Sequence, residues 1–112
     1  AAWRDTDLAR RLARYHGEQT PAMFAAWADM WEAPWFRDWN IEVALADITC
    51  PVLALQGADD AYGPPAQLDA IARGVSGPVE TVLMPGCGHS PHIEARDALL
   101  SRVTAFVENL LD

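Results

Sequence analysis

The stretch "CPVLALQGADDAYGPP", residues 50–65, joins a short apolar run to a turn rich in glycine, proline and carboxylates. The run at 52–56 is closed by Gly57 and is typical of a strand that is buried on both faces. A second apolar run at 79–84 leads into the turn "PGCGHSPH", residues 85–92. Both predicted strands therefore end in turns that carry chemically active side chains.

A helical pattern follows each strand. The segment "PPAQLDAIARG" places Leu68 and Ile71 about one helical turn apart and stops at Gly74. A last helix, which begins between Ser90 and Asp97, presents one apolar face formed by Leu99, Val103, Phe106 and Leu110. The order strand, helix, strand, helix predicts a right-handed crossover and a parallel strand pair whose carboxyl ends share one edge. The predicted fold class is α/β, as a βαβα part of a doubly wound sheet.

The N-terminal residues have helical rather than strand patterns. One helix is predicted over 5–16, with Asp5 or Thr6 as its cap. A second helix is predicted to begin with Thr20 as N-cap and to stop before Pro34. A helical segment is therefore expected to precede the βαβα unit.

The second helix carries an aromatic stripe that includes Trp27 and Trp31 at a spacing of four residues. Such side chains usually pack in a core, but on a helix that covers a binding site they would wall an apolar substrate pocket. Residues 35–48 have no clean period and are predicted to return toward the main body as a turn plus a short helix.

Composition limits the classes of partner. The 112 residues suit one small domain, and eight basic against sixteen acidic residues give a net charge of −8. This acidity argues against nucleic acid or an anionic membrane as partner. The sequence has no apolar run of about 18 residues and no signal peptide pattern, so we expect a soluble, cytoplasmic protein. The first residue is not methionine, so the true start of the protein stays open.

The two cysteines are expected to be reduced. Cys50 precedes the first strand and Cys87 follows the second, so parallel strands place the thiols at opposite ends of the sheet. That separation, roughly five rises of about 3.3 Å, exceeds the ~7 Å limit for a disulfide. Cys87 is predicted to be a small buried hydrophobe rather than a thiol nucleophile.

An acid and a base are predicted to meet at the shared strand edge. Adjacent parallel strands lie about 4.8 Å apart, so Asp59 or Asp60 comes close to His89. A carboxylate that holds the ring through its Nδ1 proton leaves Nε2 free as a general base. The alternative for His89 is a loop histidine that is hydrogen-bonded to backbone. Ser76, in "GVSGP", is rejected as a nucleophile because an elbow leaves a strand, whereas this segment enters one.

A metal site is the weaker interpretation of the histidine turn. It would use His89, His92 and an aspartate, but a His-x-x-His spacing in a loop lacks the one-face register that helical ligands have. His92 is instead expected to pair with Glu94 or to cap the last helix. We expect neither a metal nor an organic cofactor.

The segments "CPVLALQGADDAYGPPAQLDAI" and "LMPGCGHSPHIEA" resemble the C-terminal part of an α/β-hydrolase-fold enzyme. Gly57 and Asp60 match the family's G-x-x-D turn, and Gly86, Gly88 and His89 match its histidine turn. The resemblance selects Asp60 over Asp59 as the acid and assigns His89 as the base. It also implies that 1–48 is a helical cap or lid portion and that 49–112 is the C-terminal part of the hydrolase core.

The same resemblance implies hydrolysis of an ester, amide, carbon–carbon or related bond in a small, fairly apolar molecule. In the family the nucleophile, serine or aspartate, precedes the cap, so we expect it in an upstream N-terminal part of the same protein. The 112 residues alone are then expected to be inactive. The alternative is a non-catalytic fragment or truncated homologue that binds a partner through its exposed sheet edge.

Overall fold

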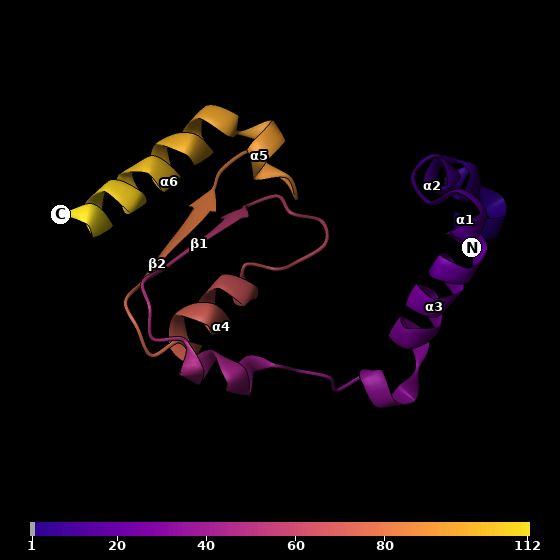
Figure 1. The fold of residues 1–112 in the computed structure, drawn as a ribbon, viewed down its shortest axis with the longest axis horizontal. Helices are drawn as coiled ribbons and strands as arrows, with labels where there is room; N and C mark the ends of the chain where they lie inside the picture. The colour runs from indigo at the N-terminus through magenta and orange to yellow at the C-terminus, as the bar shows by residue number, and fades with distance from the viewer. Residues whose placement is uncertain (1) are drawn as a thin grey trace. The chain divides into compact units, whose positions relative to one another are not determined.

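The computed structural model describes residues 2–112 (Figure 1). The chain divides into two compact units, of which the first ends at Asn40 and the second begins at Ile41. The first contains α1 (Ala2–Asp5), α2 (Leu8–His16), the 3-10 helix η1 (Gly17–Gln19), α3 (Thr20–Glu32) and the 3-10 helix η2 (Pro34–Phe36). The second contains the 3-10 helix η3 (Glu42–Asp47), β1 (Val52–Gly57), α4 (Ala66–Gly74), β2 (Val79–Met84), α5 (Pro91–Glu94) and α6 (Arg96–Leu111).

The second unit is built around the parallel pair of β1 and β2, as predicted. The register is continuous, from Val52 opposite Val79 to Gly57 opposite Met84. Figure 1 shows α4 and α6 on opposite sides of the strand pair, which is the arrangement of a doubly wound sheet. Because the two strands end in register, the loops that follow them leave the sheet side by side.

The core of the second unit lies close to the carboxyl ends of the strands. Among the described residues, the buried apolar side chains are Leu68 of α4, Met84 at the end of β2 and Cys87 in the following loop. Apolar residues earlier in the strands, such as Leu53 and Val82, are only partly buried. The best packed part of the unit is thus the edge where the predicted acid and base emerge.

The first unit departs from its predicted helices at two points. The helix expected over 5–16 is divided: α1 ends at Asp5, and α2 begins at Leu8, whose N–H donates to the hydroxyl of Thr6 at 3.2 Å. Gly17 ends α2 as predicted, with φ of 56°. Thr20 does not act as the N-cap: it is the first residue of α3, and its hydroxyl donates to the carbonyl of Gly17 at 2.7 Å.

Contacts between aromatic rings link α1, α3 and η2 of the first unit. Trp3 stacks on Phe24 with ring centroids 4.2 Å apart, and Phe24 contacts Trp27 at 5.8 Å. Trp27 contacts Trp31 at 6.3 Å, and the series continues through Phe36. Trp27 and Trp31 are 56% and 58% exposed, so they are not core residues of this unit.

The boundary between the units falls before the predicted one at 48/49, because the η3 segment packs on the second unit. The side chain of Leu45 lies against Gly74 at the end of α4. The hydroxyl of Ser76 donates to the carbonyl of Ala46 at 2.6 Å, and the N–H of Ser76 donates to that of Ile48 at 3.0 Å. The segment predicted as a turn plus a short helix therefore contains two 3-10 helices, η2 and η3, one in each unit.

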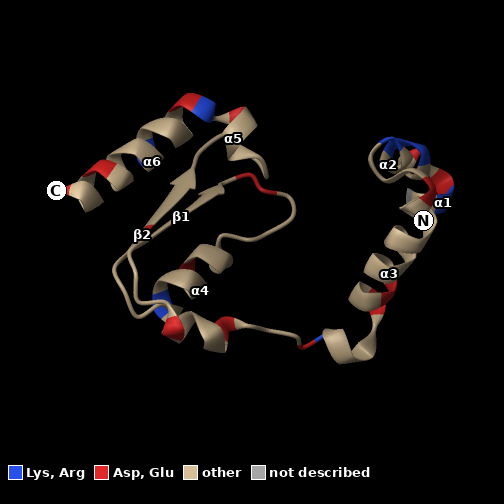
Figure 2. Cartoon of the chain, viewed as in Figure 1, with Lys and Arg blue, Asp and Glu red and all other residues tan. Residues whose placement is uncertain are grey.

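Both cysteines are free, as predicted: Cys50 is exposed and Cys87 is buried, at opposite ends of the strand pair. Figure 2 shows arginines gathered on α2, where Arg10, Arg11 and Arg14 are exposed. Across residues 2–112, none of the helices combines the length and the apolar character needed to span a bilayer.

Candidate active site

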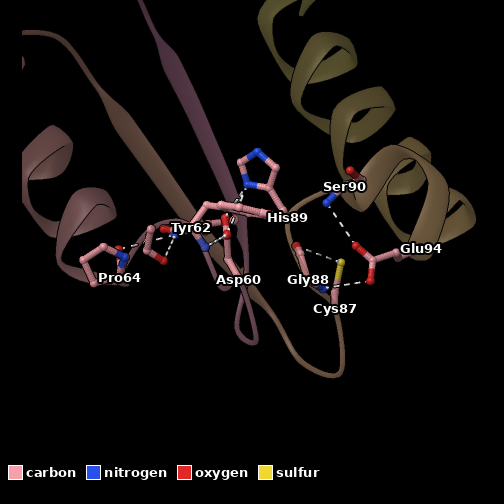
Figure 3. Close-up of polar contacts among 10 residues, drawn as sticks. Asp60, Tyr62, Pro64, Cys87, Gly88, His89, Ser90 and Glu94 are labelled. Carbon is pink, nitrogen blue, oxygen red and sulfur yellow. Dashed lines mark hydrogen bonds and ion pairs between the residues drawn. The ribbon is translucent and has the colours of Figure 1, made fainter. Parts of the chain in front are cut away.

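The structure brings Asp60 and His89 together at the carboxyl ends of the two strands. Nδ1 of His89 lies 3.1 Å from each carboxylate oxygen of Asp60 (Figure 3). Asp60 comes from the loop after β1 and His89 from the loop after β2, so residues 29 positions apart meet across the register of the sheet. Asp59, the other candidate for the acid, lies outside this contact.

Backbone hydrogen bonds join the two loops beneath the pair. The N–H of Ala58 donates to the carbonyl of Met84 at 2.8 Å, and the N–H of Asp59 donates to that of Cys87 at 2.8 Å. Gly57 allows this approach, because a Cβ at that position would collide with the carbonyl oxygens of Cys87 and Gly88. The motif glycine of the acid turn therefore sets the spacing between the loops.

The carboxylate of Asp60 is held in its ionised form. Its side chain is 9% exposed, and the backbone N–H of Tyr62 donates to Oδ1 at 2.8 Å. That N–H and then the ring of His89 lower the pKa of Asp60 below its ordinary value, against the smaller opposing effect of burial. The acid is thus ionised at neutral pH and can orient a neighbouring donor.

An ionised carboxylate only accepts hydrogen bonds, so Nδ1 of His89 carries the proton that it donates to Asp60. In Figure 3 the second ring nitrogen, Nε2, points away from Asp60. The side chain of His89 is 61% exposed, and the ring of Tyr62 contacts it edge-on at 4.8 Å between centroids. In this tautomer Nε2 is an unprotonated, accessible base.

Gln56 supports the acid loop and was missed by the sequence analysis. Its side chain is buried at the end of β1, and Nε2 donates to the carbonyl of Gly63 at 2.8 Å and to that of Pro64 at 3.4 Å. These bonds tie the far end of the loop back to the strand, with Asp60 between. A polar residue that ends an otherwise apolar strand was the available signal, because a buried amide needs partners.

Glu94 of α5 was also missed as a contact of the histidine loop. Its Oε1 accepts the N–H of Gly88 at 3.2 Å and its Oε2 accepts the N–H of Ser90 at 3.0 Å (Figure 3). The predicted pairing of His92 with Glu94 is replaced by these backbone contacts. His92 is exposed in α5 and lies outside the contact of Asp60 with His89.

Cys87 has the environment of a packing residue, as the sequence predicted. It is 1% exposed, and burial followed by the nearby charge of Glu94 raises its pKa, so the thiol stays protonated. Within residues 2–112, no group of three or more histidine, cysteine and carboxylate side chains is placed to hold a metal ion.

A hollow of about 450 Å³ runs along β1, with Asp60 and His89 among the residues that line it. The described strands pair only with each other, so the other edge of β1 has no strand beside it in residues 2–112. Within residues 41–112, no hydroxyl or thiol hydrogen-bonds to Nε2 of His89, and Ser76 binds Ala46 near the opposite end of the strands. The second unit thus presents an acid and a base beside an open strand edge.

Comparison with known proteins agrees with this architecture. A model of the alpha/beta hydrolase family matches residues 1–102. Among solved structures, the chain is similar to a His-tagged serine hydrolase involved in carbazole degradation, the CarC enzyme, with a TM-score of 0.67 and 17% identity over 85% of this chain. The chain spans 36% of that structure's length, and at this identity the likeness concerns the fold alone. No curated protein matches.

Proposed function

The chain belongs to the alpha/beta hydrolase family, and from that premise we propose that it carries the acid and the base of a hydrolase that acts on a small, fairly apolar molecule. The bond cleaved is an ester, amide, carbon–carbon or related bond. Asp60 is the acid and His89 the base. The nucleophile comes from an upstream part of the same protein, outside these 112 residues.

One observation carries the proposal: the Nδ1 atom of His89 lies 3.1 Å from an ionised, nearly buried carboxylate. This leaves Nε2 able to take a proton from a serine hydroxyl, or from the water that attacks an ester formed on an aspartate nucleophile. His89 then returns the proton to the leaving group, while Asp60 stabilises the imidazolium that forms in between. The neighbour described as a serine hydrolase favours the serine variant.

The aromatic side chains of the first unit support an apolar substrate. Trp27 and Trp31 present exposed ring surface on α3. In this proposal the first unit is the cap portion and these two rings wall the substrate pocket, where apolar surface is removed from water on binding.

The test uses the full protein encoded by the reading frame that contains these residues. Hydrolysis of p-nitrophenyl acetate and butyrate is measured for His89→Ala and Asp60→Asn, with His92→Ala and Asp59→Asn as matched controls. His89→Ala is expected to nearly abolish turnover and Asp60→Asn to lower kcat by about 10³ to 10⁴, as in other triads. A protein in which Asp60→Asn changes activity a few fold while Asp59→Asn abolishes it would show that the acid is wrongly assigned.

The open edge of β1 favours a second candidate, a non-catalytic chain that binds a partner by adding a strand there. The same experiment separates the two. A full protein with no turnover that depends on His89, but with a partner whose binding protects the β1 amides from hydrogen exchange, would favour the binding function.

A further inference from the structure

The carboxylate of Glu94 brackets the histidine of the site. Its two oxygens accept the N–H groups of Gly88 and Ser90, the residues on either side of His89, at 3.2 and 3.0 Å. The N–H of Ser90 belongs to the peptide unit that begins at His89 itself. Ionised acceptors make the stronger class of hydrogen bond, so the backbone at His89 is tied before and after the residue that bears the ring.

The loop is also fixed from its inner side. Cys87 is buried at 1% exposure, and its carbonyl accepts the N–H of Asp59 at 2.8 Å. The histidine loop is thus anchored on the core and the acid loop by Cys87, and on α5 by Glu94. Between these anchors the side chain of His89 is 61% exposed, and its ring contacts Asp60 and, edge-on, the ring of Tyr62.

Gly88 leaves room for the carboxylate. A Cβ at this position would lie 3.0 Å from Oε1 and 3.1 Å from Oε2 of Glu94, which is closer than ordinary van der Waals contact. The φ angle of Gly88 is not positive, so the loop does not need glycine there for its backbone conformation. A Cβ at position 88 would therefore make the carboxylate of Glu94 give way by a few tenths of an ångström.

From these contacts we propose that Glu94 is a positioning residue, which holds the backbone of His89 so that the ring meets Asp60. The inference rests on the proposed function, and it concerns a residue that touches neither substrate nor the reacting atoms. Glu94 acts through the amides of Gly88 and Ser90.

A purely local role at the start of α5 is the competing explanation. The N–H of Glu94 donates to the carbonyl of Ser90 at 2.9 Å while Oε2 accepts the Ser90 N–H, a reciprocal arrangement similar to a capping box. That role needs only Ser90. The bond to Gly88 lies outside the helix, before His89, and has no use in capping.

The test measures Glu94→Gln in the full protein, with Glu108→Gln on α6 as the matched control. A glutamine offers one oxygen to one amide and sets its own NH₂ against the other N–H, so one anchor is lost. We expect kcat to fall about 10- to 100-fold, as for a displacement of about 1 Å in a catalytic group, with KM within about twofold of wild type. The control is expected to keep wild-type kcat and KM.

A second readout follows the histidine directly and needs no turnover. In protein labelled at histidine, the three-bond Hα–Hβ couplings of His89 report whether its χ1 angle keeps a single rotamer. We expect one rotamer in wild type and in Glu108→Gln, and averaged couplings in Glu94→Gln. A helix-capping role alone would leave these couplings unchanged.

Gly88→Ala perturbs the same contact from the other side, because it keeps the carboxylate but crowds its two oxygens so that Glu94 must shift. It should lower kcat and average the His89 couplings as Glu94→Gln does. The kcat of the double variant should be no lower than that of the less active single variant, since both changes remove one interaction. Should Glu94→Gln fail to fold by far-UV circular dichroism, Gly88→Ala decides on the same two readouts.

The inference is overturned if kcat of Glu94→Gln stays within about twofold of wild type, if kcat falls while the His89 couplings are unchanged, or if the effects of the two variants multiply. Failure of the proposed function is recognised separately, because wild type and His89→Ala would then be equally inactive. In that case the couplings alone decide whether Glu94 orients His89.

Discussion

The interactions that stabilise the second unit internally differ from those that stabilise the first unit internally. In the second unit, backbone hydrogen bonds join β1 to β2 and each strand-end loop to its neighbour, over the buried side chains of Leu68, Met84 and Cys87. In the described part of the first unit the buried side chain is the polar Thr20. Its ring contacts lie partly within α3, as between Trp27 and Trp31, and partly between helices, as between Trp3 of α1 and Phe24 of α3.

The second unit therefore has a preset geometry, set by backbone hydrogen bonds, whereas the first unit presents an adaptable surface of exposed rings. Backbone bonds of 2.8 Å fix the relative position of the two loops, and with it the distance from Asp60 to His89. Aromatic side chains such as Trp27 and Trp31 keep more than half of their surface exposed and contact each other through ring faces and edges. In the proposed enzyme the second unit would set the chemistry, and the first unit would set which molecule reaches it.

The largest effect, loss of both solubility and activity, is expected when the 112 residues are produced alone. This experiment tests whether each unit can cover its own apolar side chains. Both leave apolar side chains uncovered, since Trp27 and Trp31 are exposed on α3 and Leu83 on β2. The chain purified alone should associate or aggregate and should hydrolyse no p-nitrophenyl ester. Light scattering after size exclusion, with an esterase assay on the same fractions, checks this. A monodisperse, cooperatively melting and active monomer would contradict it.

The next effect concerns Gly57, on which the preset geometry of the second unit depends. In Gly57→Ala the new Cβ meets the carbonyl oxygens of Cys87 and Gly88, so the acid and histidine loops must separate. We expect kcat of the full protein to fall by about 10² or more. The measurement is steady-state hydrolysis of p-nitrophenyl butyrate.

Gly86→Ala is the matched control for Gly57→Ala. Its φ of 65° disfavours alanine, but no atom lies within 4 Å of the added Cβ. It should destabilise the protein by about 1–2 kcal/mol through backbone strain, with less effect on kcat. Equal loss of kcat in both variants would show that loop strain, rather than the close approach at Gly57, governs the site.

The parallel strand pair and the meeting of acid and base could be predicted because they depend on local patterns. Apolar runs that end at glycine mark the strands, and a parallel crossover brings their ends to one edge. The contacts made by Gln56 and Glu94 depend on loop paths that no periodicity encodes. Either side chain could have faced solvent, and only the folded loops show which amides and carbonyls need partners.

The first unit was harder to predict for a related reason. The break before Leu8 coincides with a hydrogen bond from the Leu8 N–H to the hydroxyl of Thr6, and the hydroxyl of Thr20 donates to the carbonyl of Gly17 instead of capping α3. Serine and threonine side chains compete for nearby backbone groups, and the outcome depends on the turn that precedes them. The boundary at Asn40 likewise depends on the tertiary contacts of η3 with α4.

A smaller effect is expected in the first unit, where single rings can change without loss of the fold. Trp27→Ala and Trp31→Ala should raise KM for an apolar ester by about tenfold, or shift preference among acyl chains, with little change in melting temperature. Phe24→Ala is the control, because Phe24 is partly buried between Trp3 and Trp27 and should lower the melting temperature instead. If the tryptophan variants have a lower melting temperature and unchanged KM and kcat, the two rings contribute to the stability of the fold and not to substrate binding.

The smallest effect concerns the pH dependence of stability in the second unit. The pKa of Asp60 is lowered in the folded protein by the N–H of Tyr62 and by His89, so the unfolded chain takes up the proton first as the pH falls. The stabilisation by Asp60 is therefore complete above its unfolded pKa of about 3.9 and is lost as the pH drops through the lower folded value. In urea unfolding, the difference in free energy between wild type and Asp60→Asn should shrink as the pH falls from about 5 toward 3. Asp59→Asn controls for loss of a loop carboxylate outside the His89 contact. A difference between wild type and Asp60→Asn that stays constant down to pH 3 would mean that the bonds from Tyr62 and His89 do not favour the ionised acid.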